Sequence, residues 1–134
     1  MPTSMPQLFE ALTRVRSAWP KRGWSFDNRF SCVASTFNVD VVTEARAALA
    51  HALPHSFGDK TLVQASPVLQ EIAKRTGGVR AAQAILTGDP IGRITPYGLW
   101  WPWDDGRTIS MRIGLESALQ DSITQLCNTF GCEP

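Results

Sequence analysis

Residues 96–115, PYGLWWPWDDGRTISMRIGL, constrain the fold more than any other part of the chain. Trp100, Trp101 and Trp103 come directly before an Asp-Asp-Gly stretch, which is followed by an alternating apolar run. An Asp-Gly pair supplies the positive φ angles of a hairpin turn, so the pattern predicts a strand, a tight turn and a second strand. Adjacent side chains on a strand point to opposite faces of a sheet. Trp100 and Trp101 therefore cannot both enter one core, and at least one ring must meet another element, a partner or water.

The remaining patterns predict helices around a small sheet. The hairpin turns over residues 104–106, its second strand covers 108–113, and one further extended run covers 25–39. Apolar residues recur at helical spacing in five other segments. These segments are residues 5–19, 41–53, 59–75 (with a restart at Ser66-Pro67), 79–86 and 116–129. We therefore expect one α+β domain over residues 1–134, with a small antiparallel sheet of about three strands, including the hairpin, packed with four to five helices on one face.

Composition narrows the classes of partner. The formal net charge is +1, which gives little long-range attraction to nucleic acid or to an anionic membrane, so we expect neither as a partner. No apolar run reaches the roughly 18 to 20 residues of a membrane span, and no signal-type leader is visible, which predicts a cytoplasmic protein. The chain has three cysteines, Cys32, Cys127 and Cys132. An odd count without an export signal favours free thiols, although Cys127 and Cys132 could form a disulfide.

The candidate chemical sites are weak. His51 and His55 are four residues apart with Asp59 close by, a spacing that could suit a metal. Pro54 lies between them and disfavours helical geometry at the preceding residue, so we interpret the pair as the end of a helix. We expect no metal and no cofactor.

A phosphate or catalytic site is not predicted either. Gly77-Gly78 before a helix that carries Arg80 could hold an anion, but the spacing matches neither common phosphate-binding motif, and a helix breaker explains the glycines. Adjacent aspartates at an exposed turn are expected to stay solvated and ionised. No G-x-S-x-G nucleophile elbow occurs. The sequence therefore favours a protein that is not an enzyme, and we predict no catalytic residue.

Two functions remain after these exclusions. Tryptophan, tyrosine and arginine dominate protein-binding hot spots, which favours a non-catalytic protein-binding module: an adaptor, an inhibitor or immunity-type antagonist, or a regulatory subunit. Its predicted binding residues lie on and around the hairpin: Tyr97, Trp100, Trp101, Trp103, Asp104, Asp105 and Arg107. The tryptophans can equally be core residues. The alternative function is a small-molecule-binding protein or minor enzyme with a pocket between sheet and helices near His51, His55 and Arg80.

Overall fold

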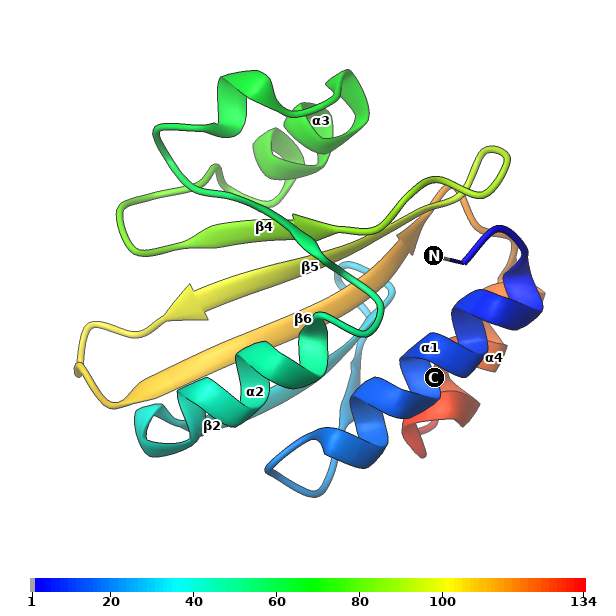
Figure 1. Ribbon diagram of the computed structural model, residues 1–134, viewed down its shortest axis with the longest axis horizontal. Coiled ribbons are helices and arrows are strands. Elements are labelled where there is room, and N and C mark those ends of the chain that lie inside the picture. Colours follow the sequence, from blue (N-terminus) through cyan, green and yellow to red (C-terminus); the bar gives the residue numbers. More distant parts are fainter. Residues whose placement is uncertain (1) are drawn as a thin grey trace.

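A six-stranded antiparallel sheet forms the centre of the computed structural model, which describes residues 2–134 (Figure 1). Across the sheet the strands lie in the order β1 (Ser25–Asp27), β2 (Cys32–Asn38), β6 (Thr108–Glu116), β5 (Thr95–Pro102), β4 (Ala84–Thr87) and β3 (His55–Phe57). Every neighbouring pair is antiparallel. The prediction of about three strands is therefore wrong, although the class is α+β as expected.

Helices cover both faces of this sheet. α1 (Met5–Ala18), α2 (Val42–Leu49) and α4 (Gln120–Phe130) pack on one face, and α1 and α2 lie in front of the sheet in Figure 1. α3 (Pro67–Arg75) covers part of the opposite face, so the prediction that all helices lie on one face is wrong. Short 3-10 turns, Val39–Val41 and Leu62–Gln64, precede α2 and α3. The predicted restart is confirmed, because the Ser66 hydroxyl accepts the Leu69 N–H at the start of α3.

The tryptophan hairpin forms where the sequence predicts it. β5 and β6 pair up to Pro102 and Ile109, and the chain reverses through residues 103–107. Gly106 has a φ of +70°, which a glycine adopts without steric cost. The Trp103 N–H donates to the Thr108 carbonyl at 2.8 Å and closes the turn.

Three strands were missed, each for a physical reason. Residues 25–39 form a hairpin of two strands, β1 and β2, because the chain turns through residues 28–31. The predicted helix over residues 79–86 is absent, and its end lies in β4 instead. All four side chains of β4 are buried, so this strand lacks the apolar–polar alternation of a half-exposed strand. β3 has three residues, too few for a periodic signal.

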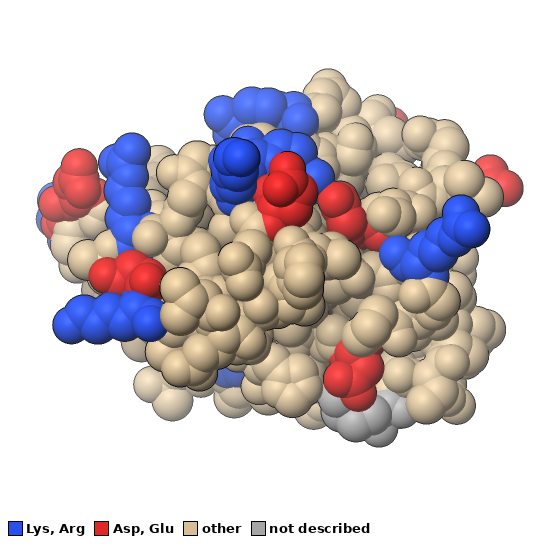
Figure 2. Space-filling model, turned by 90° about the horizontal axis from the view of Figure 1, so that it is seen from above, with Lys and Arg blue, Asp and Glu red and all other residues tan. Residues whose placement is uncertain are grey.

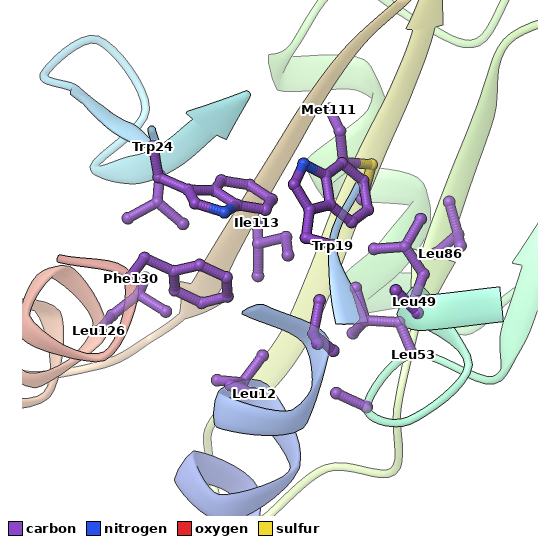
Figure 3. Packing of buried hydrophobic residues seen from close by; sticks show 14 of the residues in the cluster. Leu12, Trp19, Trp24, Leu49, Leu53, Leu86, Met111, Ile113, Leu126 and Phe130 are labelled. Carbon is purple, nitrogen blue, oxygen red and sulfur yellow. The ribbon is translucent and has the colours of Figure 1, made fainter. Parts of the chain in front are cut away.

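The first core lies between the sheet and α1, α2 and α4 (Figure 3). Trp24 lies between Trp19 and Phe130, with ring centroids 4.9 and 4.6 Å away. The Trp19 indole N–H donates to the Ser35 hydroxyl at 2.9 Å in this buried environment. Aromatic rings at these separations contribute beyond the area that they bury. The core therefore joins the end of α1, the β1 strand region and the end of α4.

The second core lies between α3 and the other face of β4 and β5. Leu69 and Ile72 of α3 pack with Ile85, Tyr97 and Leu99. The Tyr97 ring lies across β6 at Gly114, where an added Cβ would be 2.5 Å from the ring. Tyr97 is 2 % exposed, and its burial raises its pKa to about 12. The missing side chain at position 114 thus makes room for this ring.

We expect Gly114→Ala to lower the free energy of unfolding by about 1 to 3 kcal/mol, because the methyl group overpacks against Tyr97. Urea unfolding followed by circular dichroism measures the change. Gly58→Ala is the matched control, since its nearest neighbour would be 3.8 Å away, and it should change stability by less than about 0.5 kcal/mol. Equal stability of the two variants would contradict this placement of Tyr97.

Candidate functional site

The three hairpin tryptophans occupy different environments. Trp100 is 3 % exposed in the first core, where the Arg46 guanidinium lies 4.1 Å from its ring centroid. Trp101 points to the opposite face and is half-buried. Trp103 lies beyond the last pair of the hairpin and is 52 % exposed. The expectation that Trp100 and Trp101 cannot share a core is confirmed, and Trp100 is a core residue.

Trp101 packs against the edge of the second core and also belongs to a cluster of five side chains. We call it the arginine–aromatic cluster: Asp27, Arg29, Phe30, Trp101 and Arg112. The Trp101 ring meets Phe30 edge-on at 6.3 Å and the Arg112 guanidinium at 4.8 Å. Arg29 lies 4.5 Å from the centroid of Phe30. Asp27 closes the cluster, since it accepts the Arg112 Nε–H at 3.0 Å and lies 3.5 Å from Arg29. The contacts join β1, the β1–β2 turn, β5 and β6.

Asp27 forms ion pairs with both arginines of this cluster. Partial burial by itself raises the pKa of Asp27, but the hydrogen bonds from Arg112 and from the Arg29 backbone, with the charges of both arginines, lower it overall. Asp27 is therefore an anion at neutral pH. The Arg112 side chain is 16 % exposed and paired, whereas the Arg29 side chain is 64 % exposed. A molecule that approaches the cluster thus meets a fixed Trp101 ring and an accessible Arg29.

Trp103 extends the same face toward the hairpin tip. Its indole N–H donates to the Ser110 hydroxyl at 2.8 Å, and Ser110 lies 3.3 Å from the Thr36 hydroxyl on β2. This bond orients a large ring that is half in water. We call the part of the sheet that carries the arginine–aromatic cluster, Thr36, Ser110 and Trp103 the open face. It lies beside the α3-covered part of the same sheet face.

The other predicted binding residues fall into two groups. Tyr97 is buried beneath α3, so it lies outside the open face. Asp104, Asp105 and Arg107 are exposed at the hairpin turn. Asp105 accepts the N–H groups of Arg107 and Thr108 at 2.8 and 2.9 Å and also the Thr108 hydroxyl. These three bonds lower the pKa of Asp105, with the bond from the Thr108 side chain as the largest cause. Asp105 is therefore a structural residue of the turn.

The alternative function needs one pocket near His51, His55 and Arg80, but these three residues lie in three separate hollows. His51 lies in a hollow beside α1, and Arg80 lies with Trp101 in a small hollow of about 180 Å³. His55 lines a larger and mostly apolar groove of about 600 Å³ between α3 and the segment that follows β4. Its Nε2 lies 3.7 Å from an Asp89 carboxylate oxygen. Figure 2, seen from above, shows an uncharged area in the lower centre, with Lys and Arg mainly at the top and left, Asp and Glu among them, and further charged side chains at the right. The expected site that joins His51, His55 and Arg80 is thus not formed.

Two weaker candidate sites can also be placed in the structure: the anion site at Gly77-Gly78 and the metal site near His51 and His55. Gly77 and Gly78 have positive φ angles, but the helix predicted to follow them is a loop, so no helix N-terminus faces an anion there. His, Cys, Asp and Glu side chains within residues 2–134 form no group of three or more that could hold a metal ion.

Sequence reasoning missed most of the arginine–aromatic cluster. Phe30 and Asp27 were assigned to one long strand or left without a role, whereas Asp27 ends β1 and Phe30 lies in the turn that folds back over Trp101. Arg112 carried one usable signal, since it is the charged residue among the polar positions of the alternating run 108–113. Its partner could not be identified without the pairing of β1, β2 and β6.

The comparisons with known proteins add no assignment. The chain matches no protein-family model, no curated protein and no solved structure. No helix within the described residues is both long and apolar enough to cross a membrane.

We expect the hairpin tryptophans to differ sharply in their effect on stability. Trp100→Ala removes a fully packed ring and should lower the free energy of unfolding by about 3 to 5 kcal/mol. Trp103→Ala removes a ring that is 52 % exposed and should cost less than about 1 kcal/mol. Denaturant unfolding of both variants measures the difference. Similar losses would show that Trp103 is also a core residue.

We expect Asp105→Ala to destabilise the hairpin in a pH-dependent way. A carboxyl whose pKa is lowered on folding adds stability above its unfolded pKa, and this stability is lost as the pH falls through the folded pKa. The destabilisation should be full at pH 7 and should shrink as the pH falls below 3.8, the ordinary value for this carboxyl. Unfolding curves across this range test it. Asp104→Ala is the control, because the Asp104 side chain makes no hydrogen bond to the described residues, and a similar loss from it would contradict the assignment.

Proposed function

We propose that this protein is a non-catalytic protein-binding module that docks a protein partner through the open face. The observation that carries the proposal is Trp103, a large ring that is 52 % exposed and yet is held by a hydrogen bond to Ser110. An apolar ring that is oriented but only half covered gains further burial when a partner binds.

The chemistry of the open face favours a protein over a nucleic acid. Its aromatic rings lie with Arg29 and Arg112, residue types that are enriched in protein-binding hot spots. Asp104 and Asp105 are exposed at the hairpin tip beside Trp103, where their negative charges would repel a phosphate backbone. The partner that fits is a protein segment with an apolar side chain for Trp103 and a carboxylate for Arg29. Such a module can serve as an adaptor, an inhibitor or a regulatory subunit.

The proposal includes a cytoplasmic location. Cys32, Cys127 and Cys132 are free thiols, as is usual in a reducing compartment.

The groove beside α3 supports a second candidate function, the binding of a small apolar molecule. Phe57, Val68 and Leu69 supply apolar surface, and His55, Asp89 and Arg93 supply polar groups at its margin. Its volume of about 600 Å³ is in the range of small-molecule sites. A fragment screen observed by NMR separates the two candidates, because groove ligands shift the amides of Val68 and Leu69 and leave the Trp103 indole unchanged.

Affinity capture from the native host tests the main proposal. The bait proteins are the wild type, Trp103→Ala and Val63→Ala, the last as a matched control because Val63 is an apolar side chain that is 80 % exposed on another element. We expect one protein to be retained by the wild type and by Val63→Ala but lost from Trp103→Ala.

The affinity for this protein should fall by about thirtyfold in Trp103→Ala, as expected for a hot-spot residue worth about 2 kcal/mol. Isothermal titration calorimetry with the purified partner measures the change. Unfolding curves must show that Trp103→Ala is folded. Retention of the same proteins by all three baits would contradict the proposal.

A further inference from the structure

Two cysteines are brought together at the end of α4. The helix ends at Phe130, and Gly131 follows in the left-handed conformation with a φ of +72°. The N–H of Cys132 donates to the Cys127 carbonyl at 3.0 Å, and the N–H of Gly131 donates to the Asn128 carbonyl at 3.1 Å. This pair of bonds is the Schellman motif, in which the side chains of the first and sixth residues contact each other. Here both of these residues are cysteines.

We propose that Cys127 and Cys132 are a thiol pair that is oxidised reversibly to a disulfide, a modification site at the C-terminal end of α4. The inference is independent of the proposed function, because the pair lies in and beside the first core and not on the open face.

The surroundings of the thiols give each a different role. Cys127 is fully buried, and burial together with the neighbouring Cys132 thiol raises its pKa to about 11. Cys132 is half-buried and packs against the first core. Burial raises the pKa of Cys132, while its contact with Cys127 and the charge of Arg16 oppose that rise. Arg16 is held at this helix end by a 3.1 Å hydrogen bond to the Thr129 carbonyl. Cys132 is therefore the thiol that meets a reagent first, and Cys127 resolves the product.

The oxidant in this proposal is a small disulfide such as oxidised glutathione. The Cys132 thiolate attacks one sulfur of the small disulfide, which forms a mixed disulfide and releases one small thiolate. The Cys127 thiolate then attacks the Cys132 sulfur and releases the second small thiolate. The protein loses two electrons and two protons, the small disulfide gains both electrons, and the two released thiolates take up the protons. A small thiol in excess reverses both steps.

The third cysteine provides an internal control. Cys32 is fully buried on β2, where burial raises its pKa to about 12; the charges that act on it come from Asp27, Arg112 and Arg29, with a smaller contribution from Cys127 of α4. Trypsin separates the cysteines, because Cys32 falls in the peptide of residues 30–46 and the pair falls in residues 113–134.

The experiment equilibrates the 134-residue protein with reduced and oxidised glutathione at several ratios, blocks free thiols by alkylation and analyses the tryptic peptides by mass. We expect the peptide of residues 113–134 to lose the mass of two hydrogens and to escape alkylation as the oxidised fraction rises. The Cys32 thiol should stay free and should react with the alkylating agent only after the protein is unfolded. The variant Cys132→Ser should abolish this product, and Cys32→Ser should leave it unchanged.

A second measurement separates the folded geometry from simple closeness in the chain. The same equilibration in concentrated urea should need at least about tenfold more oxidising conditions, because a bridge that fits the folded helix end is favoured by folding. Formation of only a glutathione adduct on Cys132 would overturn the proposal. An equal or stronger preference for the disulfide in urea would also overturn it.

Discussion

The register between β5 and β6 determines the arrangement of the whole molecule. Trp100 pairs with Met111 and Trp101 pairs with Ser110, so the two neighbouring rings project from opposite faces. One face is covered by α1, α2 and α4, and the other is covered in part by α3. A shift of one residue would place Trp101 in the core of the three helices and Trp100 on the open face, because side chains alternate with a period of two. The division into a large core, a small core and an open face thus follows from one hairpin.

The arginine–aromatic cluster surrounds Trp101 with several weak contacts. Exposed cation–π contacts and surface ion pairs each contribute about 1 kcal/mol or less. In the cluster they act on the same five side chains, and Asp27 pairs with both arginines. Trp101 is therefore held in one orientation by contacts within the protein itself. Side chains that are already ordered lose little conformational entropy on binding, which is why a preformed aromatic surface suits a recognition role.

Local sequence patterns predict some parts of this molecule well and others poorly. Asp-Gly turn chemistry located the tryptophan hairpin, and Ser66-Pro67 located the start of α3. β4 was read as a helix because all of its side chains are buried, which removes the alternating pattern, and β3 is too short to carry one. The candidate site depends on pairings between distant strands. Trp103 was found because it belongs to the hairpin. Asp27 and Phe30 reach the site through the β1–β2 turn, and the residues that they contact lie far away in the sequence. Tyr97 was predicted to be near the surface, but α3 covers it from 22 or more residues away in the chain.

Solvent exposure of the tryptophan indoles tests the sidedness of the hairpin most directly. The ring C–H signals of the five tryptophans can be assigned in an NMR spectrum of the full chain, and a soluble paramagnetic agent broadens those that water reaches. The structure predicts strong broadening for Trp103, weaker broadening for Trp101 and almost none for Trp100, Trp19 and Trp24. Broadening of Trp100 that matches or exceeds that of Trp101, or protection of Trp103, would contradict the assignment of the two faces and of the open face with it.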